Sequence, residues 1–517
     1  MKFTLPTLIV LVALNPANLR SQVTLTSLTT NNTSACTAVG APDAGCYAAF
    51  AGLNDPNFTP ETYEPKPLNV SKVPISSLMY AKSNTFLFAH FQPWFFQNNP
   101  DKIATGYTSD NASTVSAQMT DMISRGFKAV VIDWYGQNGG DDGNTGFDDK
   151  TTTAIKSNLA PNCSAAQNCP FYFALMEDKG ALALNGCSTS SSTTAACITA
   201  LETDLTYMKS NYFGSNAYVK LTAPPGNKIS SAGRPVVFLF LLPASSYNPA
   251  TTDWDTVWAT VIPWAQTNAD NPLFWIESQF TPYATYGYPN ADAVGAYAWI
   301  NFNGTITGYY GKYFPADLYG FDALTGFYYT SFDDGYYKTQ SVTGVGYKGF
   351  DDYDSWGKVP NYNHPVIAQN CGQTFVQSFT YAGNYYSSTT QLPFLGVAVW
   401  NDYDEGTEIE TGIDNCVSSF TETLTGSTLD WDILFDCYNA ENCGSESTVY
   451  NYVIYYTTNG TELYEAGTVA SGTHTTNLCT LDKSIPSGAT IYIQAQGQPS
   501  IFNHLVSNPQ TYTNSCS

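Results

Sequence analysis

Eight short apolar runs alternate with helical segments between residues 86 and 400, and this rhythm constrains the fold more than any other feature of the sequence. Each run is long enough for a buried strand, and amphipathic stretches such as residues 113–125 separate the runs. Such alternation favours an α/β fold with a parallel sheet, and eight strands match a (β/α)8 TIM barrel. The predicted strands are residues 86–91, 128–135, 171–176, 235–240, 273–276, 293–299, 365–368 and 394–400.

The segments on either side of this region have different patterns. Residues 1–21 carry Lys2 and then an apolar stretch, which is typical of a secretory signal peptide and too short to cross a membrane. Residues 22–80, rich in Thr, Asn and Pro, predict an irregular extension that lies on the main domain. The barrel is expected over residues 81–424. Beyond it helical signals vanish, and alternating runs at 450–457 and 490–495 predict a small β-sandwich over residues 425–517.

The cysteines indicate a secreted, extracellular protein. There are 12 of them, and several lie close together in the chain, which favours local disulfides in an oxidising compartment. A zinc site is the alternative, but zinc-like Cys and His spacing is absent, so we expect no metal. Asn-x-Ser/Thr sequences are also frequent, which fits a glycoprotein. The close pairs are Cys36 with Cys46, Cys163 with Cys169, Cys187 with Cys197, and Cys437 with Cys443.

The charge and aromatic content narrow the class of partner. The net charge is −23 although only 12% of the residues are charged, which argues against nucleic acid or an anionic membrane as partner. Beyond the signal no apolar run approaches the roughly 18 residues of a membrane span, so no membrane insertion is expected. Aromatic residues make up 15% of the chain, and their rings suit sugars as well as protein cores. We expect a monomer that binds a polysaccharide or glycan and needs no cofactor.

Polar and aromatic side chains follow most of the predicted strands. In a barrel the carboxyl ends of the strands form the active site, so these residues are candidates for substrate binding, whereas the plainer reading is that strand ends are polar because they meet water. His90 in particular fits either a sugar ligand or a satisfied core histidine. The candidates are His90, Gln92, Trp94, Asp133, Trp134, Tyr135, Glu177, Asp178, Glu277, Trp299, Asn301, Asn401 and Glu408.

The strongest cluster follows the last apolar run, where the sequence from Trp400 reads WNDYDEGT. Asp402 and Glu405 are three residues apart, a spacing that brings two carboxyl groups to one pocket. A pair of carboxylates on either side of a glycosidic bond supplies a general acid and a base or nucleophile. We therefore predict Asp402 and Glu405 as catalytic residues. For Asp404 an outward, solvated acid is favoured, and of Glu408 and Glu410 one is expected to bind a sugar and the other to brace the loop.

These motifs resemble two families of secreted glycoside hydrolases over roughly residues 85–415. WNDYDE resembles the WNDYGE motif of the α-1,3-glucanases (mutanases), and EGTEIE from Glu405 looks like the end of FNEWHEGTQIE in the endo-α-1,2-mannosidase and mannanase family. The run FAHF that ends at Phe91 resembles the first strand of the glucanases, HFQPWF from His90 resembles the HxxPW start of the mannosidases, and IDWYG from Ile132 is similar to their second strand.

The resemblance implies a catalytic barrel in which Asp402 and Glu405 are the acting pair. Asp402 stands where the mannosidases have Glu, and this leaves the linkage and the stereochemistry open. The leading hypothesis is a hydrolase of an α-linked neutral polysaccharide, α-1,3-glucan-like or α-mannan-like. The alternative is a non-catalytic carbohydrate-binding or structural glycoprotein built on the same barrel. A peptidase or esterase is disfavoured because the chain has 4 histidines and neither a GxSxG nor an HExxH motif.

Overall fold

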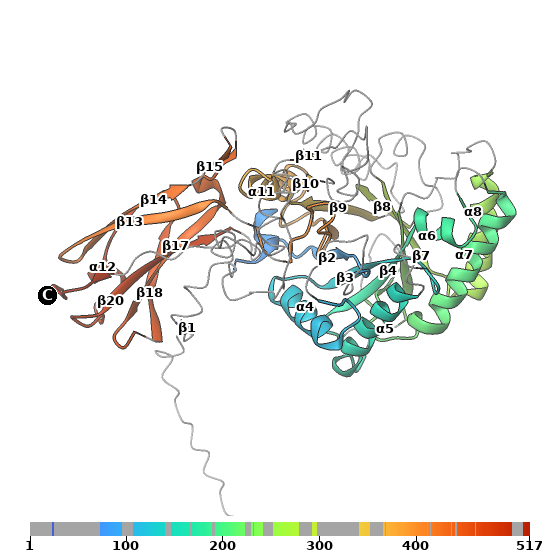
Figure 1. Cartoon of the computed structure of the whole chain (residues 1–517), viewed down its shortest axis with the longest axis horizontal. Coiled ribbons are helices and arrows are strands. Elements are labelled where there is room, and N and C mark those ends of the chain that lie inside the picture. The colour runs from blue at the N-terminus through green and yellow to red at the C-terminus, as the bar shows by residue number, and fades with distance from the viewer. Residues whose placement is uncertain are drawn as a thin grey trace, which may run out of the picture.

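A computed structural model shows an α/β barrel beside a set of antiparallel sheets (Figure 1). In Figure 1 the sheets, in orange and red, lie at one end of the elongated molecule and the barrel helices at the other. The described residues are 23–24, 73–95, 107–139, 146–165, 168–188, 192–222, 229–230, 232–240, 252–278, 292–296, 341–351, 366–367, 369–410, 412–413, 415–435, 437–439, 442–460, 462–498 and 510–516.

The barrel is a closed ring of parallel strands. Pairing of β12 with β2 and of β4 with β6 closes the ring, and a short antiparallel strand, β5 (Lys220–Leu221), extends β6 on its edge. This is the topology of a TIM barrel, so the predicted fold class is confirmed. The ring runs through β2 (Phe86–Phe91), β3 (Ala129–Trp134), β4 (Tyr172–Asp178), β6 (Arg234–Phe240), β7 (Leu273–Ser278), β8 (Ala293–Ala296), β9 (Ser341–Tyr347) and β12 (Phe394–Ala398).

Helices cover the outside of this ring. The predicted helix at residues 113–125 is α4 (Ala112–Ser124), whose N-cap Asn111 accepts the backbone N–H groups of Ser113 and Thr114, and whose buried face includes Val115 and Met119. The other helices are α5 (Phe147–Leu159), α6 (Lys179–Leu184), α7 (Thr194–Met208), which continues as the π-helix η5 (Lys209–Phe213), α8 (Trp254–Asn268) and α11 (Gln373–Thr380). Short 3-10 turns are η3 (Ile75–Leu78), η4 (Ala160–Asn162), η7 (Tyr381–Asn384) and η8 (Glu446–Thr448).

One predicted barrel strand, residues 365–368, is wrong. In the structure β11 (Val366–Ile367) pairs antiparallel with β10 (Phe350–Asp351), apart from the ring. The barrel strand between β8 and β12 is β9, whose sequence SVTGVGY contains too few apolar residues to stand out. The outer side of β9 packs directly against α11. Glycine is required at position 346 because a Cβ atom there would lie 2.2 Å from the ring of Phe379 in α11.

Replacing Gly346 by Ala is therefore expected to destabilise the barrel. The added methyl group collides with a buried ring in the core, and overpacking of this kind lowers the free energy of unfolding by about 1–3 kcal/mol. Urea unfolding of the variant measures the change. Gly214→Ala is the matched control, because nothing lies within 4 Å of a Cβ built there, and its effect should stay within about 0.5 kcal/mol. Equal free energies of unfolding for the two variants would show that α11 moves to make room for the added methyl group without loss of stability.

The C-terminal region forms antiparallel sheets, as predicted. Residues of two sheets share one core that includes Leu429, Trp431, Tyr452 and Ile493, so the sheets pack face to face. One sheet has the order β13 (Val417–Thr425), β14 (Thr428–Phe435), β19 (Thr475–Asn477). The other has the order β1 (Val23–Thr24), β18 (Glu462–Ala470), β17 (Val449–Thr457), β20 (Thr490–Gly497), β21 (Gln510–Thr511). A separate pair is formed by β15 (Cys437–Asn439) and β16 (Asn442–Cys443), and the short helix α12 (Leu478–Leu481) contacts β18 and β19.

The described residues of the predicted N-terminal extension, 23–24 and 73–80, lie in two places. Val23 and Thr24 pair with β18 of the C-terminal sheets, whereas Ile75, Leu78 and Met79 belong to the core of the barrel, the main domain on which the extension was expected to lie. Tyr455 and Tyr456 of β17 are 8% and 9% exposed and pack inside the C-terminal region. The domain limits stay a prediction, and β13 of the C-terminal sheets already begins at Val417.

Disulfides fasten both regions. The predicted local bridges Cys163–Cys169 and Cys187–Cys197 are confirmed. Two further bridges span long separations, Cys371–Cys416 and Cys479–Cys516, and the first joins the start of α11 to the start of β13. Cys437 and Cys443 are partners in the β15–β16 pair, and the predicted Cys36–Cys46 pair and signal peptide lie outside the described residues. Within the described part of the chain, no helix is both long enough and apolar enough to span a membrane.

Candidate functional site

The strand register decides which candidate side chains face the barrel interior. Phe88 lies inside, because its ring centroid is 5.1 Å from that of Phe238 on a distant strand. Residues in register on parallel strands point to the same side, and alternate residues share a face. Since Phe88 pairs with Ala129, and Ala129 with Tyr172, the interior face continues through His90, Asp133 and Asp178. These three residues lie at the carboxyl ends of their strands, where a barrel places its active site.

His90 is a buried, uncharged histidine. Its ring lies 5.5 Å from that of Phe88 and 6.4 Å from that of Phe238, and Gly396 on β12 leaves room for it. Desolvation lowers the pKa of His90 to about 3, so the imidazole is neutral at physiological pH. A neutral ring at this depth is a hydrogen-bonding group and contributes no charge to the site.

Trp134 and Glu177 face the helices rather than the interior. Trp134 stacks on Tyr207 of α7 at 5.8 Å and donates a hydrogen bond of 3.1 Å to Asp149 of α5. Glu177, the register partner of Trp134, lies next to Asp204 of α7, and burial followed by the neighbouring carboxylates raises its pKa well above the usual value. The structure therefore separates these two predicted residues from His90 and Asp133.

The other residues predicted to bind substrate do not share one location in the structure. Asp178 is the N-cap of α6 and accepts the backbone N–H of Gly180. Trp94 is buried edge-on against the partly exposed Tyr135 at 5.7 Å, in a small cluster that also includes Tyr403. For Glu277 the structure describes only the backbone, in β7, and Trp299 and Asn301 lie outside the described residues.

The loop after β12 folds back on itself over the mouth of the barrel. The peptide bond between Ala398 and Val399 is cis, and the next residue, Trp400, donates its backbone N–H to the carbonyl of His90 at 2.7 Å. Further along, the N–H of Thr407 bonds the carbonyl of Asp402 at 3.1 Å, and the N–H of Ile409 bonds that of Trp400 at 3.0 Å. Residues 402–405 are consequently held at the carboxyl end of β12, beside the end of β2.

Asn401 ties this loop to the segment after β2. Its Oδ1 accepts the backbone N–H of Gln92, and its Nδ2 donates to the Gln92 carbonyl, both at 2.8 Å. Because its side chain is fully buried and both amide atoms bond the backbone, Asn401 orients the loop. The arrangement places the Gln92 side chain next to Asp402.

Asp402 and Glu405 lie together at the mouth. Asp402 Oδ2 accepts a hydrogen bond of 3.1 Å from Gln92 Nε2, and its Oδ1 accepts the backbone N–H of Glu405 at 3.2 Å. Both donors favour the ionised form of Asp402. The two residues are 2% and 8% exposed, and Asp404 is 3% exposed, so the expectation that Asp404 is an outward, solvated acid is wrong.

Glu408 forms a fully buried ion pair with Lys348. Lys348 Nζ lies 2.5 Å from Glu408 Oε1, and neither side chain has any exposed surface. Burial raises the pKa of Glu408 to about 7 against the opposing effect of Lys348, and the nearby Asp402 adds to the increase. The same burial lowers the pKa of Lys348. Lys348 follows β9, so this pair joins the loop after β12 to the neighbouring strand of the barrel.

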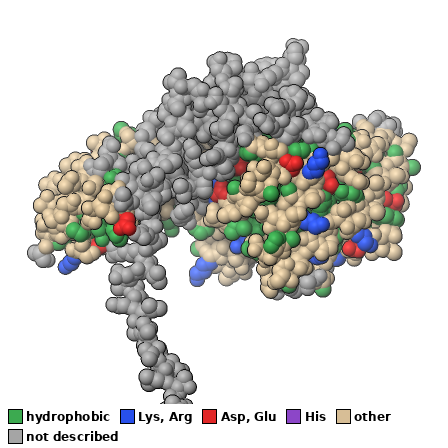
Figure 2. Space-filling view, turned by 60° about the horizontal axis from the view of Figure 1, so that its bottom comes forward, with side chains coloured by type: hydrophobic (Ala, Val, Ile, Leu, Met, Phe, Trp, Pro, Cys, Tyr) green, Lys and Arg blue, Asp and Glu red, His purple; other side chains and the backbone are tan. Residues whose placement is uncertain are grey.

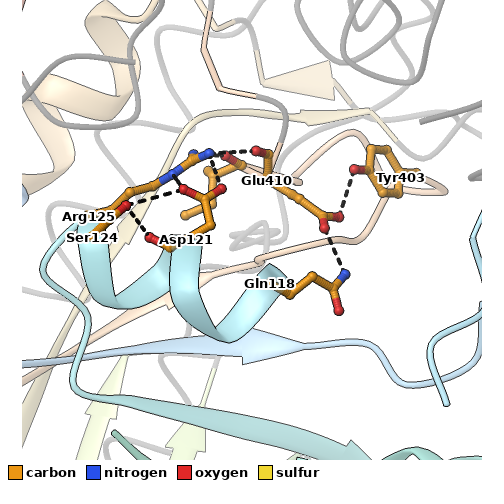
Figure 3. Close-up of polar contacts among 7 residues, drawn as sticks. Gln118, Asp121, Ser124, Arg125, Tyr403 and Glu410 are labelled. Carbon is orange, nitrogen blue, oxygen red and sulfur yellow. Dashed lines mark hydrogen bonds and ion pairs between the residues drawn. The ribbon is translucent and has the colours of Figure 1, made fainter. Parts of the chain in front are cut away.

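Glu410 and Arg125 anchor the far end of the loop to α4 (Figure 3). Arg125 pairs with Asp121, donates to the carbonyls of Ile409 and Glu410 at 2.8 Å each, and lies over the Trp400 ring at 5.1 Å. The Glu410 carboxylate accepts from Gln118 at 2.7 Å, Tyr403 at 2.9 Å and Tyr107 at 3.0 Å. Glu410 therefore braces the loop from the side of α4, as Glu408 does from the side of β9 through Lys348.

Sequence reasoning missed Lys348 and Gln118 as partners of this loop. Lys348 follows a strand that was not recognised, and Gln118 is one polar residue on an amphipathic helix, so neither carried a signal of its own. Arg125 is the last residue of the predicted helix at 113–125 and likewise carried no signal as a partner of the loop. Among the residues that the structure describes, no group of three or more His, Cys, Asp or Glu is placed to hold a metal ion.

Solved structures with a similar fold include glycoside hydrolases. An endo-α-mannosidase of glycoside hydrolase family 99 from Bacteroides thetaiotaomicron is 11% identical, with a TM-score of 0.41 over 64% of this chain and 88% of that chain. A glycoside hydrolase-like protein is 14% identical, with a TM-score of 0.44 over 64% and 88%. A family 5 glycoside hydrolase from Bacteroides vulgatus is 8% identical, with a TM-score of 0.35 over 81% and 92%. No family model and no curated protein matches the sequence.

Proposed function

We propose that this chain is an extracellular glycoside hydrolase that cleaves an α-linked neutral polysaccharide with Asp402 and Glu405. The observation that carries the proposal is the placement of both carboxylates, almost fully buried, at the carboxyl end of β12 in a closed barrel. A glycosidase needs two carboxyl groups beside the scissile bond, one to protonate the leaving oxygen and one to act as base or nucleophile. The two positions match the acidic pair of the motifs quoted above.

The surroundings of the two acids suggest separate roles. Asp402 accepts two hydrogen bonds that stabilise its negative charge, so it acts as the nucleophile or as the base that activates water. Glu405 is the more exposed of the two and supplies the proton to the leaving oxygen. In this scheme His90 and Asp133, on the interior face of the barrel, bind sugar hydroxyls. No metal or cofactor takes part in this scheme.

The described residues on the face drawn in Figure 2 and the disulfides fit a neutral substrate outside the cell. On the face drawn in Figure 2, charged side chains among the described residues are few and are scattered between neutral ones. A polyanion or polycation would call for a continuous patch of one sign. The disulfides support an oxidising compartment, and hence an exported enzyme.

The test is release of reducing sugar from a panel that contains α-1,3-glucan, α-mannan and β-linked controls. We expect the wild-type protein to hydrolyse one α-linked polymer, and both Asp402→Asn and Glu405→Gln to lose that activity while folding normally. Asp432→Asn, an exposed acid of β14, is the control for expression and handling and should hydrolyse at the wild-type rate.

The opposite outcome would favour the alternative function. If no polymer is cleaved, and wild type and both variants bind a glycan with equal affinity, the barrel is a binding scaffold. If only a β-linked polymer is cleaved, the fold and the acid pair stand and the substrate class is wrong.

A further inference from the structure

Tyr403 connects the two acids to a buried anchor. It stands between Asp402 and Glu405 in the chain, its ring packs edge-on against Phe95 at 5.8 Å, and it has no exposed surface. Its hydroxyl donates to Glu410 Oε2 at 2.9 Å. Because the N–H of Thr407 bonds the carbonyl of Asp402, residues 402–407 form one closed turn. A rotation of Tyr403 would therefore move both acids.

The Glu410 carboxylate receives donors from three separate elements, as Figure 3 shows in part. Gln118 comes from α4, Tyr107 from the segment before α4, and Tyr403 from the loop itself. Asp121 also faces this carboxylate, and Arg125 neutralises Asp121 while holding the Glu410 carbonyl. Burial raises the pKa of Glu410 to about 7. Burial of a carboxylate at this depth costs free energy of solvation. The three hydrogen-bond donors offset this cost only while they stay in place.

We propose that Glu410 is a positioning residue, which acts through the Tyr403 hydroxyl to fix the turn that carries Asp402 and Glu405. The inference rests on the proposed catalytic pair. The hydrogen bond between Asp402 Oδ1 and the N–H of Glu405 requires one particular turn between these residues. Loss of the Tyr403 anchor leaves this turn free to shift, and a shift of about 1 Å at a catalytic group lowers the rate by up to roughly 100-fold.

Tyr403→Phe tests the proposal with Tyr107→Phe as its matched control. Each variant removes one hydroxyl that donates to the same Glu410 oxygen, at 2.9 Å and 3.0 Å, but only Tyr403 belongs to the catalytic turn. Tyr107 also receives a weak contact of 3.4 Å from Asn401, whose stronger bond to Gln92 is untouched. We expect Tyr403→Phe to lower kcat by roughly 10- to 100-fold at an unchanged KM, and Tyr107→Phe to have a much smaller effect.

Rescue by a conservative variant separates positioning from a general loss of stability. Glu410→Ala removes the acceptor and should reproduce the kcat loss of Tyr403→Phe. Glu410→Gln keeps an oxygen for both tyrosines, and its new NH2 group can donate to Gln118 Oε1, which has no hydrogen-bond partner among the described residues. We expect Glu410→Gln to restore most of the kcat. Equal kcat values for Tyr403→Phe and Tyr107→Phe, or no rescue by Gln, would overturn the proposal.

Amide hydrogen exchange supplies a readout that needs no substrate. In Tyr403→Phe the backbone N–H groups of Glu405 and Thr407, both bonded to Asp402, should exchange faster than in wild type, and in Tyr107→Phe they should not. If the wild-type protein cleaves nothing but this difference appears, the proposed function fails and the positioning role of Glu410 stands. If exchange is the same in both variants, the positioning role fails whatever the activity.

Discussion

Glu405→Gln is expected to lower kcat on the polysaccharide by about 10²–10⁴-fold, the usual contribution of a general acid, and yet to spare cleavage of an activated glycosyl fluoride. The amide fills the same volume but has no proton to give to the leaving oxygen. Fluoride departs without protonation, so the missing acid matters little for that substrate. Steady-state rates on the polymer and on the fluoride of the same sugar measure the two losses.

Asp402→Asn is the comparison that assigns the two roles. The base or nucleophile is needed for either leaving group, so this variant should lose activity on the polymer and on the fluoride alike. The hydrogen bonds that Asp402 accepts from Gln92 and from the Glu405 N–H do not involve the leaving group. They are therefore the same whether the substrate is the polymer or the fluoride. A reversed pattern, with the fluoride spared in Asp402→Asn and not in Glu405→Gln, would exchange the roles of the two acids.

Lys348→Met is expected to have the largest effect on stability, a loss of about 3–5 kcal/mol in the free energy of unfolding. It leaves Glu408 fully buried without the ammonium group that now lies 2.5 Å away. The loss should shrink as the pH falls. In the wild type the folded pKa of Glu408 is raised to about 7 from 4.5 although Lys348 lowers it, so removal of Lys348 raises this pKa further. The folded variant therefore takes up the proton at a higher pH than the folded wild type does, and its stability rises more as the pH falls. Denaturant unfolding at pH 5 and pH 8 measures the difference.

Two variants control for this result. Lys209→Met removes a partner of Asp270 from an exposed pair, 37% and 49% exposed, and should cost no more than about 1 kcal/mol at either pH. Adding Glu408→Leu to Lys348→Met removes the stranded charge and should recover most of the stability. A pH-independent loss in Lys348→Met would mean that the methionine side chain packs poorly and that the charge is not the cause.

Much of the barrel could be predicted because local patterns report burial directly. Continuous apolar runs such as residues 86–91 and 394–400 become strands that are buried on both faces, so each has a strong signal of its own. The strand β9 is the exception, because its sequence is not a continuous apolar run. Its Gly346 is needed for the packing of Phe379, and a close approach of this kind leaves no periodic pattern in the sequence.

The candidate site also has features that the sequence predicts and features that only the tertiary structure shows. By itself the sequence determined the α/β class, the antiparallel C-terminal sheets, two local disulfides and the prediction that Asp402 and Glu405 act as a pair, because each depends on residues close together in the chain. Only the tertiary structure decided that Trp134 and Glu177 face the helices, that Lys348 neutralises Glu408, and that Arg125 and Gln118 hold the loop. The physical reason is that side-chain direction and burial depend on strand register and on partners far apart in sequence, and a one-residue change of register sends every side chain to the opposite face.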